Sequence, residues 1–474
     1  MSTGPASRSV VCSGMSAGTD GESASGNGGP PYDAVVVGGG IGGLSAAWRL
    51  RHRRILLLEA GDRVGGRIRS EERGAYWLNF GAHLFGPPDS PAGQLVDVLG
   101  LEARPIPGDR LGIAMGGRVV AGGASETFPL RLPLSLGGRL SLVRLGLRMR
   151  IGVGRLLAVQ AARPGEAPTA RRSRQLAFEN ERTLADYVGR LHPEIKLLLR
   201  TVTERTSAPP EAMAAGYGMT SFAQVWSKHS FGRNLVGGSS RLPHAIAAAL
   251  GPEVVRLNAP VRSVAQHDEL VEVLYREGGQ ERRALARHAV VATPADVART
   301  LVRGLPTDTQ AALGRVRYGP FLSAAILTGE DEPMPFDGNY AIATPGLSFG
   351  VFFNQASTLR SGPRRSGGSL MLFRGAEGAA ELMAGPDTEI ERRFLIDLER
   401  LFPGTRRVVR EVAVQRWPQG APYSFPGRAE LQAALTRALD RVHLAGDYLE
   451  FPCMDAAIAT GMEAAERIEA AVTA

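Results

Sequence analysis

Five glycines within six residues, GGGIGG at positions 38–43, follow a short valine-rich apolar run. Gly38, Gly40 and Gly43 have the spacing G-x-G-x-x-G, and a helix-like segment and a second apolar run ending at Glu59 come after them. This order predicts a strand, a glycine turn, a helix and a second strand. Such glycines permit a tight turn, and the helix N-terminus presents free N–H groups to a phosphate. The segment therefore predicts a Rossmann-type nucleotide-binding unit.

The acid at the end of the second run narrows the choice of nucleotide. Glu59 stands 21 residues after Gly38. A carboxylate in this place accepts hydrogen bonds from ribose hydroxyls and disfavours a 2′-phosphate. FAD or NAD is therefore expected, and NADP is not.

The residues that follow Glu59 carry a family resemblance. The segment EAGDRVGGRIRS resembles the loop after the ribose-binding acid in the family of FAD-dependent amine oxidases, protoporphyrinogen oxidases and carotenoid (phytoene) desaturases. The resemblance implies that Gly65 and Gly66 lie close to FAD. It also implies that Arg67 neutralises pyrophosphate charge through a charge-assisted hydrogen bond. The segment LNFGAHLFG is similar to the family's next block, beside the flavin ring.

The resemblance resumes in the second half of the chain. NAPVRSV resembles the strand whose backbone contacts the adenine, here at Val261. VHLAGDYLEFPCMDAAIATGMEAAERI resembles the C-terminal flavin motif, in which Asp447 would bond the ribityl chain. The helix that opens around Met454 and Ala457 would point its N-terminus at the pyrimidine edge of the flavin, because a helix N-terminus favours the negative charge of reduced flavin.

These blocks follow one another in the family's order, so FAD is the expected cofactor. Covalent attachment through a cysteine, found in some members, has no counterpart around Pro422, and noncovalent binding is expected. An NAD-dependent dehydrogenase would explain the glycine loop but neither the GGR loop nor the C-terminal AGD block. No metal site is predicted.

The resemblance implies an α/β fold in which a Rossmann-type FAD-binding domain carries an inserted α+β substrate domain. The FAD-binding domain would be assembled from residues 32–105, 232–300 and 412–474. The substrate domain would be assembled from a mostly helical insertion, 106–231, and a sheet-containing insertion, 301–411. Residues 1–31, rich in serine and glycine, are predicted to form a disordered tail.

Departures from the amine oxidase pattern favour other branches of the family. Amine oxidases usually place a lysine, water-bridged to the flavin, on the strand that here carries Ser323. They also hold the amine between two aromatic rings; one ring position falls on Cys453, and the other lies near Tyr423. The LAGDY and FGAH segments look more like those of desaturases and protoporphyrinogen oxidases, which take hydride from a C–H bond.

We therefore predict an FAD-dependent oxidase or dehydrogenase that performs a two-electron oxidation of a small, largely apolar molecule, with oxygen or another acceptor. An amine oxidase and a flavin-binding protein without turnover are the alternatives. His83 is the best candidate for a base because an ordinary imidazole pKa is near neutrality, and a structural role is the interpretation that we favour. Tyr423 would wall the pocket. Cys453 is either a reactive thiol at a helix N-terminus or, as we favour, a small residue that makes room for substrate.

The composition indicates in which cellular compartment the protein is expected. Cys12 and Cys453 are the only cysteines, which excludes a disulfide framework and favours a reducing compartment, so a cytoplasmic location is expected. No apolar run of about 18 residues is present, and a transmembrane helix is not expected. The net charge is +8, but no nucleic-acid-binding motif accompanies it, and no nucleic-acid partner is expected.

One segment is strongly basic. Residues 130–174 contain ten arginines and a single acid, Glu166, among many leucines. Arg144, Arg148 and Arg155 fall within about 40° of one another on a helix. A solvated face on a helical domain is the favoured interpretation of this segment, and peripheral contact with anionic lipid is the alternative. The sequence does not indicate an oligomeric state.

Overall fold

The computed structural model describes residues 30–223, 225, 232–359 and 365–473. Almost all of the predicted tail, residues 1–31, lies outside the described residues. The predicted strand–helix–strand unit is present as β1 (Tyr32–Val37), α1 (Ile41–Arg49) and β2 (Ile55–Leu58). β1 and β2 are parallel, and β2 is buried along its whole length, which explains why its sequence is continuously apolar.

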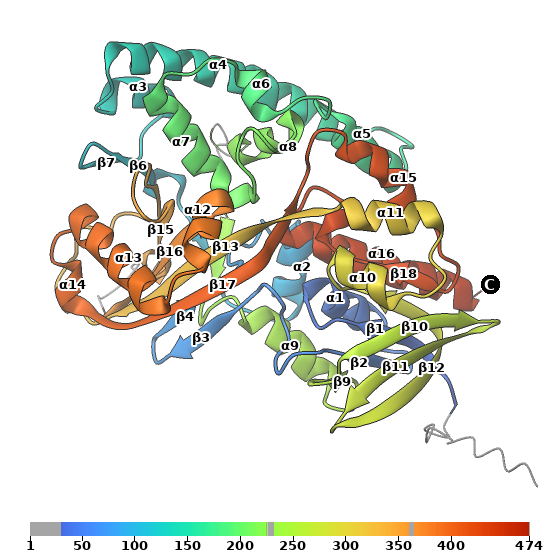
Figure 1. The fold of residues 1–474 in the computed structure, drawn as a ribbon. Coiled ribbons are helices and arrows are strands. Elements are labelled where there is room, and N and C mark those ends of the chain that lie inside the picture. Colours follow the sequence, from blue (N-terminus) through green and yellow to red (C-terminus); the bar gives the residue numbers. More distant parts are fainter. Residues whose placement is uncertain (1–29, 224, 226–231, 360–364, 474) are drawn as a thin grey trace, which may run out of the picture.

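This unit belongs to a seven-stranded sheet built from distant parts of the chain (Figure 1). Its order is β10 (Val261–His267), β11 (Leu270–Glu277), β12 (Gln280–Val291), β1, β2 and β9 (Val255–Arg256), and β18 (Val442–Leu444) pairs with β12. β12 and β18 run parallel to each other, and β1 runs parallel to β12 on its other side. The strands come from the three segments that the sequence assigns to the FAD-binding domain.

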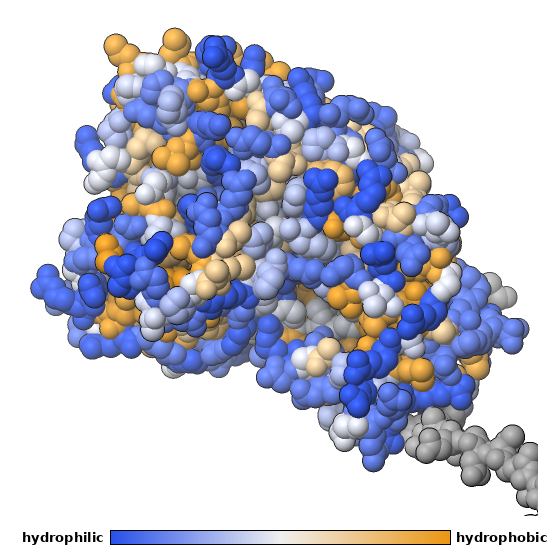
Figure 2. All heavy atoms as spheres, viewed as in Figure 1, coloured by the Kyte–Doolittle hydropathy of each residue, from blue (hydrophilic) through white to orange (hydrophobic). Residues whose placement is uncertain are grey.

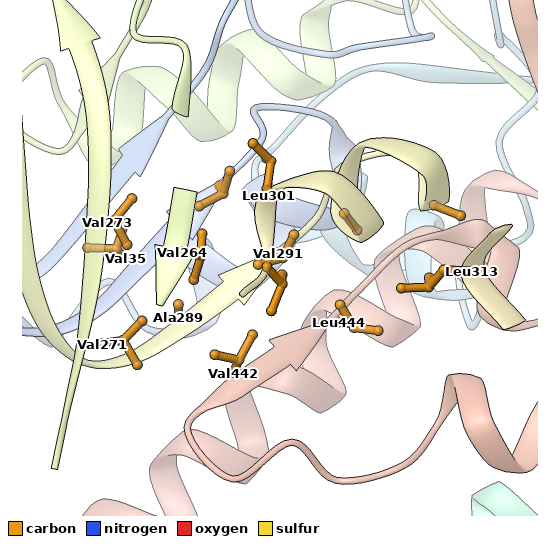
Figure 3. Close-up of a cluster of buried hydrophobic side chains, with 14 of the residues drawn as sticks. Val35, Val264, Val271, Val273, Ala289, Val291, Leu301, Leu313, Val442 and Leu444 are labelled. Carbon is orange, nitrogen blue, oxygen red and sulfur yellow. The ribbon is translucent and has the colours of Figure 1, made fainter. Parts of the chain in front are cut away.

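Helices cover both faces of this sheet. On one face, Val35, Val291 and Leu444 pack against α10 (Ala295–Leu301) and α11 (Thr307–Arg315) (Figure 3). On the other face, buried residues of β1 and β2 pack against α1, α9 (Arg241–Leu250) and α16 (Met454–Thr473). The predicted α/β fold class is confirmed, and this layering places the N-termini of α1 and α16 together.

A second seven-stranded sheet forms the other lobe. Its order is β17 (Val409–Tyr423), β13 (Arg317–Thr328), β16 (Gly368–Gly375), β15 (Val351–Asn354), β14 (Ala341–Ala343), β6 (Leu111–Met115) and β7 (Arg118–Ala121). Its core packs against α13 (Asp387–Leu401) through Ile390, Phe394 and Leu398. The predicted boundary at residue 412 falls inside β17, and the mostly helical insertion contributes two strands, β6 and β7, to this sheet.

Helices of residues 128–219 run along the top of the molecule in Figure 1, above the second sheet. They are α3 (Phe128–Arg131), α4 (Leu136–Gln160), α5 (Pro168–Ala177), α6 (Leu184–Val188), α7 (Pro193–Thr203) and α8 (Ala215–Met219). Leu145, Met149 and Val153 of α4 pack against Leu184 and Leu199. No helix among the described residues is long and apolar enough to cross a membrane.

Short elements complete the fold. The chain leaves the first lobe near β5 (Ala103–Ile106) and returns to it near β8 (Gly232–Leu235). These two segments lie side by side, because β5 pairs with β8. The remaining strands and helices are β3 (Ser70–Arg73), β4 (Tyr76–Asn79), α2 (Pro91–Val98), α12 (Ala376–Met383), α14 (Thr405–Val408) and α15 (Gln432–Leu435).

Candidate active site

Each of the three motif glycines occupies its position for a different structural reason. Gly38 has φ +106°, and a Cβ there would lie 2.8 Å from the carbonyl oxygen of Ala292. A Cβ on Gly43 would overlap the carbonyl oxygen of Gly38, so this glycine lets α1 pack on the end of β1. Gly40 differs, because a Cβ there would meet no protein atom within 4 Å. The space in front of Gly40 is open toward the N-terminus of α1.

The N-terminus of α1 is suited to an anion. No side chain caps it, and its first turn holds no acidic residue. Its first N–H groups therefore lack intrahelical and side-chain acceptors, and the positive end of the helix dipole faces the open space at Gly40. This arrangement is what a pyrophosphate requires.

Glu59 is held firmly at the end of β2. Its carboxylate oxygens accept hydrogen bonds from the backbone N–H groups of Gly39 at 2.6 Å and Gly61 at 2.7 Å. Its backbone carbonyl accepts from the N–H of Ala259 at 2.8 Å, two residues before Val261 opens β10. The predicted ribose-binding acid and the predicted adenine-contacting strand therefore lie side by side.

The GGR loop closes over the glycine turn. Gly65 and Gly66 have φ values of +102° and +54°, which favour glycine at both positions. The N–H of Gly65 donates to the carbonyl of Gly39 at 2.8 Å. Arg67 then donates to Asp447 Oδ1 at 2.8 Å and to the Gly420 carbonyl at 3.3 Å.

The pairing of Arg67 with Asp447 joins the two flavin motifs. The Asp447 side chain is almost fully buried, while about a third of the Arg67 side chain is exposed. Burial lowers the pKa of Arg67, but the Asp447 carboxylate outweighs this effect, and the net pKa is raised. The residues predicted for the pyrophosphate and the ribityl chain thus contact each other, with the exposed part of Arg67 left to face a ligand.

The N-terminus of α16 completes the site. Met454 opens this helix. A Cβ on Gly42 would lie 3.0 Å from the carbonyl oxygen of Ala457, so α1 and α16 touch at their N-terminal ends. Asp455 is turned away to α2, where its Oδ1 accepts from the N–H of Ala92 at 2.8 Å.

Two helix N-termini, an open glycine turn, the acid Glu59 and the partly exposed Arg67 therefore lie next to one another. These groups fit FAD, which supplies a two-electron acceptor when bound. Among the residues that the structure describes, no cluster of His, Cys, Asp or Glu could hold a metal ion.

His83 is buried and neutral. Its Nδ1 contacts the Gly81 carbonyl at 3.0 Å, which makes Nδ1 the protonated nitrogen, and its ring meets Phe353 edge-on at 4.8 Å between centroids. Burial lowers the pKa of His83 to about 4. An imidazole with this pKa is a weak proton acceptor near neutrality. The packing favours the structural role, and the catalytic role stays a prediction.

Cys453 stands at the start of α16, where its sulfur accepts from the N–H of Ala456 at 3.4 Å. The residue is exposed, yet the protein around it desolvates the thiol. This burial, reinforced by the carboxylates of Asp455 and Glu450, raises the pKa of the thiol to about 12. The favoured interpretation, a small neutral residue, fits this environment better than a reactive thiolate does.

Tyr423 is half-buried at the end of β17 and packs against the cores of both lobes. Sequence reasoning missed its neighbours on the helical side. Tyr217 of α8 contacts the ring of Phe451 at 5.8 Å between centroids, two residues before Cys453. Phe451 lies inside the C-terminal motif and could have been noticed there, but no motif marks Tyr217.

The backbone carbonyl of Phe80 was also missed. It accepts hydrogen bonds from Ser323 Oγ at 2.7 Å and from Trp417 Nε1 at 2.9 Å. Ser323 is fully buried in β13, between Phe373 and Gln415 on the neighbouring strands. The position that the resemblance assigns to the lysine of amine oxidases is therefore occupied by a small side chain whose hydroxyl is already bonded.

The fold and the site define a two-lobed flavoprotein that binds FAD at the edge of a Rossmann-type sheet. The chain matches the family of flavin containing amine oxidoreductases over residues 41–469, and it belongs to this family. The predicted family, the cofactor FAD and the predicted FAD-dependent oxidoreductase activity are thereby confirmed.

Individual relatives come from two kinds of enzyme. The coproporphyrinogen III oxidase of Mycobacterium tuberculosis is 27% identical over 448 residues, covering 89% of this chain and 93% of its own. The putrescine oxidase of Kocuria rosea is 29% identical over 244 residues, covering 49% of each chain.

Solved structures show the same fold. Putrescine oxidase bound to putrescine has a TM-score of 0.74 at 20% identity, covering 93% of this chain and 99% of its own. Cyclohexylamine oxidase from Brevibacterium oxydans has a TM-score of 0.73 at 22% identity, covering 94% and 100%. At this level of identity the similarity establishes the fold and does not identify a substrate.

Proposed function

We propose that the chain oxidises a largely apolar, porphyrinogen-like molecule, removing two hydrogens at a time, rather than a simple amine. The observation that carries the proposal is the buried Ser323 at the place of the amine oxidase lysine. The similarity to coproporphyrinogen III oxidase supports it, because that similarity spans 89% of the chain, whereas the similarity to putrescine oxidase spans 49%.

Lys196, the lysine that the structure describes, does not replace the missing one. Lys196 lies on α7, where its exposed ammonium pairs with Glu211 at 3.4 Å. Lys228 lies outside the described residues. Ser323 is 1% exposed and donates its only hydroxyl proton to the Phe80 carbonyl, so it offers a water neither the charge nor the free N–H donors of a lysine ammonium.

The described side chains contribute position and shielding. Tyr217 and Phe451 form an aromatic contact beside Cys453, and Tyr423 connects this contact to the core of the FAD-binding lobe. Apolar walls of this kind exclude water and orient a substrate carbon, which is the contribution a protein makes to cofactor chemistry. Removal of hydrogen from a C–H bond places little demand on a basic side chain, which agrees with the depressed pKa of His83.

The proposal is tested by anaerobic reduction of the purified holoprotein. The visible flavin band is followed after mixing with coproporphyrinogen III, protoporphyrinogen, a polyene, putrescine or cyclohexylamine. We expect bleaching with a porphyrinogen and none with the amines. Bleaching by the amines alone would establish the amine oxidase alternative, and no bleaching by any compound would support a flavin-binding protein without turnover.

Three further expectations belong to this proposal. FAD is bound noncovalently, so heat denaturation releases it into the supernatant, and flavin that stays with the pellet would contradict this. The electron acceptor is oxygen or another small molecule. Rapid return of the flavin colour when the bleached protein is exposed to air would indicate oxygen, and slow return would indicate another acceptor. The protein is cytoplasmic, and contact of residues 130–174 with a membrane surface is a separate proposal that depends on α4 and not on the flavin chemistry.

A further inference from the structure

The outer surface of α4 carries a line of exposed apolar side chains. Leu136 is 86% exposed, Leu140 65% and Leu147 62%, with Val143 and Ile151 more than half exposed between and beyond them. Figure 2 shows hydrophobic side chains at the upper edge of the molecule, where Figure 1 places α3 and α4. We call these five residues the outer stripe.

The outer stripe lies opposite the face that α4 uses for packing. At about 100° per residue, the five side chains fall within about 80° of one another. The buried residues Leu145, Met149 and Val153 lie on the other side and contact the helices around them. The fold thus satisfies one apolar face of α4 and leaves a second one in water, and contiguous patches of this kind mark interaction sites.

The segment that carries the outer stripe has charge of one sign, and the nearby acids come from other elements, among them Glu194, which accepts from Ser135 Oγ at 2.8 Å. Residues 131–163 contain seven arginines and no acidic residue. Two of these arginines pair with acids from other elements, Arg150 with Glu126 at 3.0 Å and Arg155 with Glu179 at 3.4 Å. Arg144 keeps no carboxylate partner among the described residues. The surface therefore complements an anionic partner.

A cavity of about 270 Å³ opens beside Leu140, between α4 and residues 188–192. Arg144, Arg148 and Arg190 line it, and no aspartate or glutamate does. Arg148 is fixed by hydrogen bonds to the carbonyls of Tyr187 and Val188. A polar anionic group would fit here while an apolar chain attached to it followed the leucines.

We propose that α4 lies in the interface of an anionic lipid bilayer, with the outer stripe inserted among the acyl chains and the arginines at the level of the lipid phosphates. A helix with an apolar face flanked by arginines has the composition of an interfacial helix. A second copy of the chain is not expected to cover the outer stripe, because a two-fold contact would bring the same arginines face to face.

This placement selects and refines the alternative interpretation of residues 130–174 as a lipid contact. The predicted arginine face, Arg144, Arg148 and Arg155, lies beside the outer stripe and not at its centre. Arg148 points to α6, where its guanidinium is held by backbone carbonyls. The insertion is therefore carried by leucine, valine and isoleucine, and the arginines select the lipid charge.

The test is flotation of the full-length holoprotein with vesicles of phosphatidylcholine alone and of phosphatidylcholine with phosphatidylglycerol. We expect binding to the mixed vesicles that weakens at high salt, since exposed charges are screened. The double substitution Leu140→Glu and Leu147→Glu is expected to lower binding at least about tenfold, because inserting apolar side chains supplies the affinity. Arg144→Gln with Arg190→Gln is expected to lower it at least about fivefold.

A matched control uses Ile396→Glu, an exposed apolar residue of α13 that is not part of the outer stripe, and this variant is expected to leave binding unchanged. Flavin content and thermal unfolding show whether each variant is folded. Failure of wild type to float with the mixed vesicles, or equal flotation of the double leucine variant, would overturn the proposal. Equal binding to the uncharged vesicles would do the same, as would a dimer in solution that the leucine substitutions dissociate.

Discussion

Gly40→Asp separates cofactor binding from folding more cleanly than any other substitution in the site. A side chain at Gly40 meets no protein atom within 4 Å, and the backbone there, with φ −68° and ψ 171°, suits any residue. Gly40 is also the N-cap of α1, where aspartate is favoured over glycine by a few tenths of a kcal/mol. The fold of the flavin-free protein should therefore be unharmed.

The same carboxylate would face the pyrophosphate. Two unit charges about 4 Å apart repel by about 4 kcal/mol at the effective dielectric of a protein surface, which corresponds to a loss in affinity of about 10³-fold. We expect Gly40→Asp to be purified colourless, and titration of the flavin-free protein with FAD to show the weakened binding. Circular dichroism and thermal unfolding should match those of flavin-free wild type.

Gly338→Asp provides the matched control, because Gly338 is exposed, has open space around it and belongs to none of the segments assigned to FAD. This variant should remain yellow. If Gly40→Asp keeps its flavin at full occupancy, the glycine turn does not hold the phosphates and the assignment of the site is refuted. If Gly40→Asp unfolds, Gly40→Ala tests the same space without added charge.

Three further predictions follow from the same geometry. The pKa of His83 is about 4 in the folded protein against an ordinary 6.5, so the unfolded chain binds a proton that the folded chain excludes. The free energy of unfolding should therefore fall by about 2 kcal/mol from pH 7 to pH 5. Denaturant titrations of His83→Gln should lack this part of the pH dependence. Gly43→Ala drives a Cβ into a backbone carbonyl and should lower the stability of the flavin-free protein by about 1–3 kcal/mol, whereas Gly40→Ala should lower it by less than about 0.5 kcal/mol. The same denaturant titrations measure both values, and equal losses would contradict the contact geometry. With a thiol pKa of about 12, Cys453 in a Cys12→Ser background should react with iodoacetamide at least about tenfold more slowly than glutathione near pH 8, and faster alkylation would revive the reactive thiol.

The residues of the glycine turn could be predicted from the sequence because each acts through local backbone geometry. Gly38 requires a positive φ, Gly43 permits the close approach of α1 to β1, and Glu59 owes its position to the end of a buried strand. Such requirements are met within a few residues of chain, and a spacing pattern records them.

Contacts between distant segments could not be predicted in the same way. Arg67 and Asp447 are 380 residues apart, and no spacing pattern links them. The resemblance assigned each residue to FAD separately. The ion pair between them is visible only in the folded structure, where the two loops meet. The boundary predicted at residue 412 lies inside β17, which continues through it as one strand paired with β13.

The environment of Cys453 shows how tertiary structure can reverse a local expectation. A helix N-terminus lowers the pKa of a thiol, and the sequence places Cys453 at one. In the fold, enclosure by protein and the carboxylates of Asp455 and Glu450 work in the opposite direction and raise the pKa to about 12. Glu450 and Asp455 are visible in the sequence, but the enclosure that makes desolvation the largest effect is not.

The two faces of α4 give the sharpest example. Its sequence has leucines at helical spacing on both sides, so periodicity alone cannot say which side packs. The choice is made by α6 and α7, whose Leu184 and Leu199 cover Leu145 and Met149. Once that face is buried, Leu140 and Leu147 must point outward, and Arg148 is drawn to the carbonyls of α6. The lipid contact predicted from the arginines therefore moves to the leucines, and for this reason the vesicle test substitutes Leu140 and Leu147 and leaves Arg148 in place.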